Sequence, residues 1–307
     1  MTATVQPREI EGEQLALRVS ALLFALAAWP LLLVDVPPFQ DLPNHLATVT
    51  VLLHPSQYPE FVFNGFLKTN GALFAWLYFV GRAVGLPLAS RLFTALVLAV
   101  GALVLPRFVL EMTGSRARMK SAMLFAWPFV HNWFVSMGML DFALGVPLSL
   151  LALLLLERQR REWSWGRAAA IAGVAVATWY AHVFALLVVH LLVGIHALVQ
   201  AFAGRGQPWK ARLSEVRLLV PLFPGTVLAL ASLYGHFTEP GGAMQGFVKL
   251  SMSLPPWELL YNAWSEWQWG FTSLSITSLV ATVGLAYFAW KNRRECPPFF
   301  GGCAFLT

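Results

Sequence analysis

The sequence contains few charged residues. Asp, Glu, Lys and Arg together make up 12% of the 307 residues, whereas hydrophobic residues make up 58%. A soluble domain carries roughly 25% charged residues. So few charges cannot cover the surface of a soluble globule of this size, and the mean hydropathy of +0.64 agrees with this. The composition therefore indicates an integral membrane protein.

Cysteine is scarce, and several common motifs are missing. The two cysteines, Cys296 and Cys303, lie close to the end of the sequence, so no disulfide framework or zinc site is evident. The sequence also lacks a Gly-rich phosphate loop, a nucleophile elbow and an internal repeat. The first apolar run is too long for the core of a signal peptide, and no small-residue cleavage site follows it, which favours a retained helix.

Long apolar stretches predict membrane-spanning helices, which need about 20 mostly apolar residues each. Two stretches of nearly 40 residues, 120–157 and 167–203, are long enough for two short helices each and predict helical hairpins. Single spans are predicted at 14–34, 91–111, 216–234 and 272–290. Together they predict an all-α, polytopic transmembrane helix bundle of about eight spans. We expect a single domain over residues 1–307, with no soluble domain.

The basic residues predict the topology. The formal charge is +6, and because Lys and Arg are enriched in cytoplasmic loops of membrane proteins, we do not interpret the excess as nucleic-acid binding. Most of the 21 basic residues lie in clusters at 8–18, 107–120, 158–167, 205–217 and 291–294. If all the clusters face the cytoplasm, both termini are cytoplasmic. Residues 35–90 and 235–271 then form two large outer loops.

One apolar segment, residues 71–88, conflicts with this topology if it crosses the membrane. Its sequence is "GALFAWLYFVGRAVGLPL", which contains Arg82 and ends in Gly-Leu-Pro-Leu. A crossing here would place the basic clusters that follow on the outer side. We therefore interpret the segment as a juxtamembrane helix in the first outer loop, half-buried in the headgroup layer. A true span is the competing interpretation.

Ionisable residues gather on the predicted outer face. Charges at membrane depth are costly, so such residues are functional candidates. Asp41 and His45 lie four apart in "PPFQDLPNHLA" (residues 37–47), on one face of a helix that begins at the prolines. Asp41 is either the N-cap of this helix, with His45 a hydrated interfacial side chain, or a general base or a ligand for a phosphate-bound divalent metal.

Asp141 and His182 are the other main candidates. Asp141 in "MGMLDFALGVPL" begins an apolar span. It is either a favourable charge at a helix N-terminus or a functional acid, and His131 and Asn132 are its nearest potential partners in the sequence. His182 in "WYAHVFA" is either a turn histidine facing water or part of an outward-facing cavity that it shares with the two aspartates.

The order of these features resembles the GT-C superfamily, multi-span glycosyltransferases that take a sugar from a polyprenyl-phosphate carrier on the outer leaflet. The resemblance rests on "PPFQDLPNHLA" with Asp41, "FVGRAVGLPLASRLF" for the surface helix and the next span, "EMTGSRARMKSAMLFAWP" for a cytoplasmic turn, and "GMLDFAL" with Asp141. It covers residues 14–205, by architecture more than by letters. Members generally continue with further spans and often a soluble C-terminal domain, so the match is to an N-terminal core, and truncation is an open alternative.

The resemblance implies roles for particular residues. It implies Asp41 as the catalytic base or the acid that positions the acceptor, and Asp141 as a second outer acid that sometimes binds metal. The expected catalytic residues are therefore Asp41 and Asp141. Mg²⁺ or Mn²⁺ is the expected cofactor if these aspartates hold one. The basic residue that grips the carrier phosphate is not evident, and Lys68, Arg82 and Lys249 are the candidates. The expected substrate-binding residues are His45, His131, Asn132, His182, Arg82 and Glu258.

The expected function is transfer of a sugar at the extracytoplasmic face of the bacterial inner membrane. The expected partners are membrane lipid, a polyprenyl-phosphate sugar donor and a glycan, lipid or protein acceptor, with no nucleic acid. A transporter and a non-catalytic membrane subunit are the rival classes. Transporters place polar residues along a path through the bundle, often with broken helices and inverted repeats. Here the acids gather at one face instead.

Overall fold

The computed structural model describes residues 7–63, 65–124, 130, 133–203, 208 and 214–238. Every regular element in these ranges is helical, which confirms the all-α prediction. The chain divides into two compact units. The first contains Met1–Leu191 and Glu215–Thr226, and the second contains Leu192–Ser214 and Val227–Thr307. The candidate site described below lies in the first unit.

Five helical segments in the described ranges are long and apolar enough to cross a membrane, which confirms the membrane class. Three coincide with predicted single spans, and two coincide with the second half of each predicted hairpin. They are Glu11–Leu32, Leu86–Thr113, Leu140–Arg161, Val183–Phe202 and Glu215–Ser232. The first combines α1 (Pro7–Ala28) with η1 (Trp29–Leu32), and the last combines η2 (Ser214–Leu222) with α12 (Phe223–Thr238).

The remaining predicted spans are only partly described. The stretch predicted as a hairpin at 167–203 contains two helices, α9 (Trp165–Ala181) and α10 (Val183–Ala203), with His182 between them. The first half of the hairpin predicted at 120–157 contains the end of α5 (Arg116–Leu124) and residues outside the described ranges. The span predicted at 272–290 and nearly all of the outer loop 235–271 also lie outside them. The count of eight spans therefore stays a prediction.

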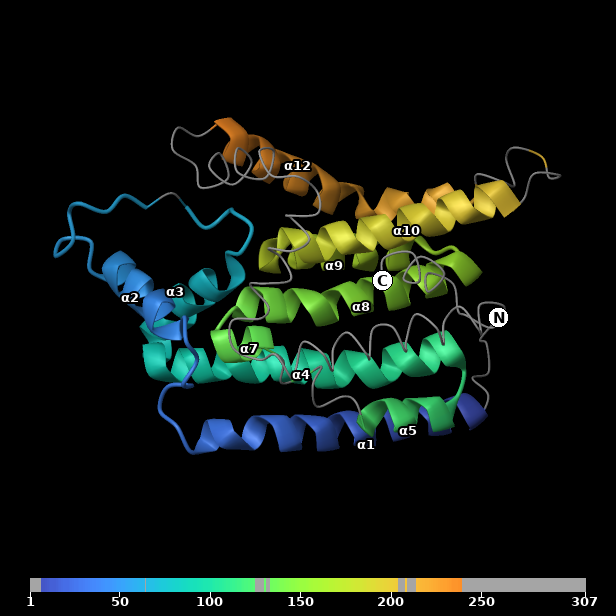
Figure 1. Ribbon diagram of the computed structural model, residues 1–307, viewed down its shortest axis with the longest axis horizontal. Helices are drawn as coiled ribbons and strands as arrows, with labels where there is room; N and C mark the ends of the chain where they lie inside the picture. Colours follow the sequence, from blue (N-terminus) through green and yellow to red (C-terminus); the bar gives the residue numbers. More distant parts are fainter. Residues whose placement is uncertain are drawn as a thin grey trace, which may run out of the picture. The chain divides into compact units, whose positions relative to one another are not determined.

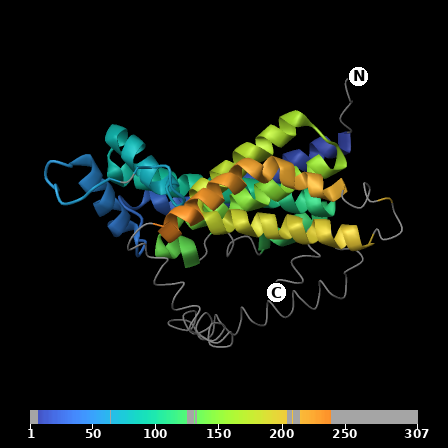
Figure 2. The same ribbon diagram turned by 90° about the horizontal axis from the view of Figure 1, so that it is seen from above.

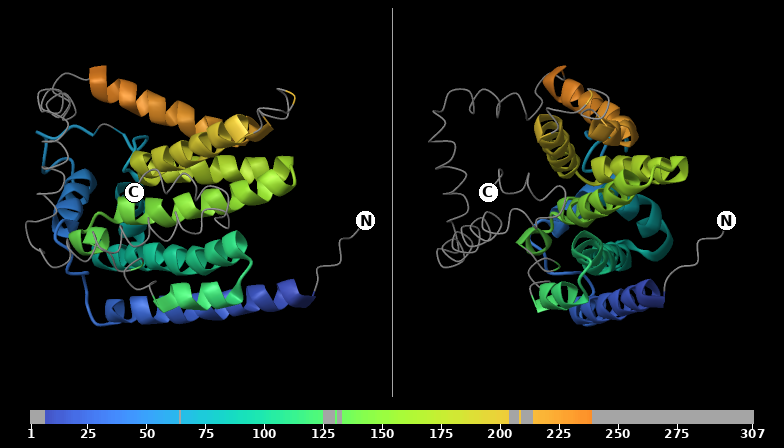
Figure 3. Two further views of the ribbon diagram at one scale, coloured as in Figure 1. Left: turned by 45° about the vertical axis from the view of Figure 1, so that its right-hand side comes forward. Right: turned by 90° about the vertical axis from the view of Figure 1, so that its right-hand side faces the viewer.

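The long helices of the first unit pack side by side. Figure 1 shows α1, α4 (Leu86–Thr113), α8 (Leu140–Arg161) and α9 side by side in that order, and both views of Figure 3 keep the order. In this row α4 and α8 run in the same direction, whereas α1 and α9 run in the opposite direction. A short connection explains the reversal between α8 and α9, because a helix that follows another after a few residues packs back against it in the opposite direction. Only residues 162–164 separate α8 from α9. Turns and short helices therefore collect at the two ends of the row.

Three short helices lie at the end where α1 finishes and α4 and α8 begin (Figure 1). They are α2 (Leu42–Leu53), α3 (Ala72–Val84) and α7 (Trp133–Met137). The 13 residues of α3 extend about 20 Å, which is less than the roughly 30 Å of a bilayer core. This length favours the interpretation of residues 71–88 as a surface helix over a true span. Its placement relative to a membrane stays a prediction.

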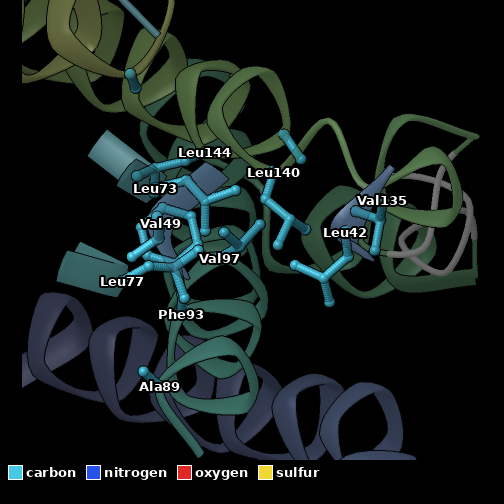
Figure 4. Packing of buried hydrophobic residues seen from close by; sticks show 12 residues of the cluster. Leu42, Val49, Leu73, Leu77, Ala89, Phe93, Val97, Val135, Leu140 and Leu144 are labelled. Carbon is cyan, nitrogen blue, oxygen red and sulfur yellow. The ribbon is translucent and has the colours of Figure 1, made fainter. Parts of the chain in front are cut away.

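A buried hydrophobic cluster attaches these short helices to the long ones (Figure 4). Leu42 and Val49 of α2, and Leu73 and Leu77 of α3, are buried against residues of α4 and α8. The spacing of seven residues in the first pair and of four in the second places both side chains of each pair on the inner face of their helix. The partners on the long helices and α7 include Phe93, Val97, Val135, Leu140 and Leu144. The first outer loop is thus packed against the bundle at this end.

Charged residues collect at the opposite end of the unit, where α4 and α8 end and α1 begins. Glu111 of α4 accepts from Arg158 at 2.8 Å and from Arg161 at 3.1 Å, both on α8. Glu13 of α1 pairs with Arg107 at 3.5 Å and with Arg158 at 3.7 Å. Two of the predicted basic clusters, 107–120 and 158–167, therefore share one end with acidic partners. The side of the membrane that this end faces stays a prediction.

Glu157 of α8 is the most buried acid of this charged end. Its side chain is 1% exposed and pairs with Arg160 at 2.8 Å and Arg161 at 2.9 Å. Both arginines lie on the same helix, three and four residues further on, where an acid followed by a base is favourable. The buried carboxylate thus depends on three charge-assisted hydrogen bonds from these two arginines.

We expect Glu157→Gln to lower stability by roughly 1.5–3 kcal/mol, because it removes the negative charge from hydrogen bonds to charged groups. Glu162→Gln, at an exposed position one turn away, is the matched control and should change stability little. Thermal unfolding of both variants in the same detergent measures the difference. Equal midpoints for the two variants would show that the buried carboxylate contributes nothing.

Candidate functional site

Asp41 is held by its backbone at the start of α2. Its N–H donates to the Met137 carbonyl at 2.8 Å, and its own carbonyl accepts from the N–H groups of Asn44 and His45. Asp41 occupies the N-cap position of α2, as one of the two interpretations predicts, but its carboxylate accepts no capping hydrogen bond from that helix. The main chain is therefore fixed while the carboxylate is not used for capping.

Gly138 allows this contact between the Asp41 turn and the turn that precedes α8. Its φ is +84°, a conformation that side chains rarely adopt, and a Cβ here would lie 3.0 Å from the Leu42 nitrogen and 3.2 Å from the Asp41 nitrogen. Gln40 adds a second link, because its N–H donates to the Ser136 carbonyl at 3.3 Å. The close approach of the two turns thus depends on a glycine at position 138.

Asp141 lies in the first turn of α8, but its carboxylate caps the N-terminus of α3. One carboxylate oxygen, Oδ1, accepts from the Leu73 N–H in the first turn of α3 at 2.8 Å, and the residue is 8% exposed. The N-cap residue of α3 is Gly71, which has no side chain to satisfy this donor. A negative charge at a helix N-terminus is also electrostatically favourable. The buried Asp141 therefore has a clear structural partner, which the sequence did not indicate.

Thr69 and Gly71 attach the start of α3 to the turn between α9 and α10. The Thr69 hydroxyl donates to the Trp179 carbonyl at 3.0 Å and accepts from the Val183 N–H at 2.9 Å. The Gly71 N–H donates to the Tyr180 carbonyl at 3.1 Å. These bonds satisfy main-chain groups near the helix ends that have no intrahelical partner. They bring the segment before α3 against the turn that contains His182.

His182 contacts Phe142, the residue that follows Asp141 in the sequence. Its ring packs edge-on against Phe142 with 4.8 Å between centroids, and its Nδ1 accepts from the Phe184 N–H at 3.3 Å. Burial lowers the pKa of His182 below its ordinary value of 6.5. The imidazole is therefore uncharged at neutral pH. It lies in the turn between α9 and α10, as one interpretation predicts, and it is half-buried there. The cavity shared with the two aspartates stays a prediction.

His45 lies one turn after Asp41 and packs on α3. Its ring meets Phe74 edge-on at 5.2 Å between centroids. Burial lowers the pKa of His45 from 6.5, and the nearby negative charge of Asp41 partly opposes this change. The ring is therefore neutral at neutral pH. A neutral imidazole can both donate and accept a hydrogen bond, which suits contact with a hydroxylated substrate.

Four of the predicted site residues thus lie at one end of the first unit. Asp41 and His45 share α2, and His45 reaches Phe74 of α3, whose neighbour Leu73 binds Asp141. His182 joins the set through Phe142. Asp41 and Asp141 are thus connected indirectly, through the His45–Phe74 ring contact and the hydrogen bond from the Leu73 N–H.

Other predicted site residues are not brought into this set. Arg82 lies in the last turn of α3, about 14 Å along the helix from Leu73, and is exposed. Its guanidinium donates to the Tyr78 hydroxyl at 3.1 Å and stacks on that ring at 5.3 Å. His131, Asn132 and Glu258 lie outside the described residues.

Arg91 is a residue at this end that the sequence did not single out as a site. Its Nη1 donates to the Val34 carbonyl at 3.3 Å and so joins the start of α4 to the chain just after α1. Its Nε is buried and has no hydrogen-bond partner within the part of the chain that the structure describes. The one feature of the sequence that distinguished Arg91 was its position outside the basic clusters.

The described residues do not assemble a metal site. Within those ranges, no group of three or more His, Cys, Asp and Glu side chains could hold a metal ion. Mg²⁺ prefers several oxygen ligands in octahedral geometry, whereas Oδ1 of Asp141 is already bound to the Leu73 N–H. Mg²⁺ is often bound by only one or two carboxylates together with water and substrate phosphates, so the expected Mg²⁺ or Mn²⁺ stays a prediction.

Comparison with known proteins found no similar protein. No protein-family model, no curated protein and no solved structure matches the chain.

We expect Gly138→Ala to destabilise the protein more than Gly114→Ala does. Both glycines have positive φ, so each alanine pays roughly 1–2 kcal/mol of backbone strain. Only at position 138 does the new Cβ also meet main-chain atoms, because nothing lies within 4 Å of a Cβ at position 114. Thermal unfolding of both variants measures the difference. A smaller loss for Gly138→Ala would contradict the close contact with the Asp41 turn.

We expect Asp141→Ala to cost about 0.5–2 kcal/mol of stability, as loss of a helix cap does, and Asp141→Asn to cost less. The asparagine keeps a carbonyl oxygen that can accept from the Leu73 N–H, whereas alanine leaves this donor without an acceptor. Hydrogen exchange of the first turn of α3, followed by mass spectrometry, should speed up in the alanine variant. Unchanged exchange in that variant would exclude the capping role.

Proposed function

We propose that the protein is a glycosyltransferase that moves a sugar from a polyprenyl-phosphate donor to an acceptor hydroxyl at the extracytoplasmic membrane face. The observation that carries the proposal is the state of Asp41. Its main chain is fixed by hydrogen bonds at both N–H and carbonyl, yet its carboxylate does not cap α2. An ionisable group at the edge of a membrane bundle that does not cap the helix it begins is a candidate for chemistry.

The chemistry requires a base near an acceptor hydroxyl. In the transfer, the bond between the sugar C1 and the carrier phosphate oxygen breaks, and a bond forms between C1 and the acceptor oxygen. The carrier leaves as polyprenyl phosphate, and the hydroxyl proton passes to the Asp41 carboxylate. General-base help of this kind contributes roughly 10²–10⁴-fold. The neutral ring of His45, one turn further along α2, is suited to orient a hydroxyl group.

The leaving phosphate gains from a nearby cation or dipole. Lys68 and Arg82 both lie between α2 and the end of α3, and Lys249 lies outside the described residues. Arg82 is already paired with Tyr78 on the exposed surface of α3. The choice between these residues stays open, as it does from the sequence.

We assign Asp141 a positioning role within this proposal. Its carboxylate holds the first turn of α3, and α3 carries Phe74, the ring against which His45 packs. A change at Asp141 is thus expected to act on the reaction through the placement of α3 and His45. This differs from the direct catalytic role that the resemblance implied.

The test is sugar transfer from a polyprenyl-phosphate donor in purified membranes that contain the protein or a variant. We expect Asp41→Asn to lower the rate by roughly 10²–10⁴-fold, because the amide cannot take the acceptor proton. Asp35→Asn is the matched control, since Asp35 is an exposed acid in the same loop. It should transfer at the unaltered rate.

Asp141→Asn separates positioning from catalysis. Because the asparagine can still accept from the Leu73 N–H, we expect it to retain most of the activity, whereas Asp141→Ala loses activity together with stability. Equal transfer by the unaltered protein and by Asp41→Asn would refute the assignment of the base. Loss of transfer in Asp141→Asn at unchanged stability would return Asp141 to a catalytic role.

A further inference from the structure

The loop between α2 and α3 carries large apolar side chains on its surface. Val62 is 84% exposed and Leu67 is 82% exposed, and Phe61 and Phe63 are also exposed. Figure 2 shows this loop, drawn in blue, reaching beyond α2 at the end of the first unit. Scattered apolar residues on a surface need no explanation, but a contiguous group indicates an interaction site.

Phe66 attaches the loop to α3 through a cluster of rings. Its centroid lies 4.7 Å from that of Phe63, 5.0 Å from Tyr78 and 5.4 Å from Phe79. Such tilted and edge-on contacts stabilise aromatic pairs by roughly 0.5–1.5 kcal/mol beyond burial. The loop and the outer side of α3 therefore form one surface, made of residues 61–63, 66, 67, 78 and 79, which we name the aromatic surface.

The helix that supports this surface is apolar on both sides. Leu73, Leu77 and Gly81 face the bundle and are buried. Phe79, on the other side, is 62% exposed. A water-facing helix has a polar outer face, whereas a helix that is hydrophobic all round lies in a protein core or in lipid. The outer side of α3 is exposed here, so lipid is the environment that fits it.

The polar groups at the edge of the aromatic surface fit a membrane interface. Arg82 donates to the Tyr78 hydroxyl and stacks on its ring. Tyrosine prefers the headgroup level, where its ring is apolar and its hydroxyl is hydrated, and Arg near a helix end extends towards the same level. This pair marks the boundary between the apolar rings and the water.

The spanning helix that follows α3 continues the apolar exposure. Leu88, Leu92 and Leu96 of α4 are exposed and spaced by four residues, so they form one stripe. This stripe begins shortly after Gly85, where α3 ends. Because α4 is long and apolar enough to cross a membrane, its exposed leucines indicate acyl chains as their environment.

We infer that the aromatic surface inserts into the bilayer at the boundary between headgroups and acyl chains, beside the start of α4. The irregular backbone of the loop can be hydrated at this depth, which it could not be in the hydrocarbon core. The partner is membrane lipid itself. The inference concerns how the first outer loop is anchored, and it does not depend on sugar transfer.

The test places nitroxide spin labels on single cysteines in a chain with Cys296 and Cys303 replaced by serine, reconstituted in lipid bilayers. The labelled positions are Val62→Cys, Leu67→Cys and, on α3, Phe79→Cys. The matched control is Gln57→Cys, an exposed polar position on the same loop. Collisions of each label with oxygen, which partitions into lipid, are compared with collisions with a water-soluble nickel chelate.

We expect the labels at 62, 67 and 79 to meet oxygen more often than nickel, and the label at 57 to show the reverse. Labels at 62 and 67 that meet nickel as often as the label at 57 would place the loop in water and overturn the inference. Labels that meet neither agent would show that protein covers the surface, which also overturns it. The label at 79 provides an independent reading if a loop variant does not fold.

Discussion

The hydrogen bond between the Asp141 carboxylate and the Leu73 N–H determines how the first outer loop meets the bundle. α3 begins at a glycine, so its first turn needs an acceptor from another element. The start of α8 supplies it. With α3 held, Phe74 is placed against His45, and Thr69 and Gly71 reach the turn that contains His182. The position of α3, and through Phe74 that of the His45 ring, thus depends on this buried acceptor.

The two ends of the first unit are stabilised by different forces. At one end, acids of α1 and α4 meet arginines of α4 and α8 in ion pairs. At the other end, main-chain hydrogen bonds and a buried apolar cluster join short helices to long ones. Charged side chains that are already in ion pairs with each other are less available to bind a substrate. A carboxylate at the end held by main-chain and apolar contacts is accordingly easier to interpret as functional than one in the ion-pair network.

The sequence predicted the membrane class, the all-helical architecture and a short helix within residues 71–88, because these depend on run length and on the period of apolar residues. It did not predict the partner of Asp141. The nearest polar neighbours, His131 and Asn132, were the natural choice, whereas the observed donor lies 68 residues away. It also grouped Arg82 with the site by charge alone. Tertiary packing determines both the partner of Asp141 and the position of Arg82, and a local sequence pattern does not contain this information.

The contact between residues 40–41 and 136–137 uses only peptide groups. Peptide groups are the same in every residue except proline, so these hydrogen bonds do not depend on which side chain occupies position 41. Folding therefore exerts little selection for an acid there. If sequences that share this architecture retain an aspartate at position 41 while the neighbouring residues vary, the retained aspartate would indicate selection for function and not for folding.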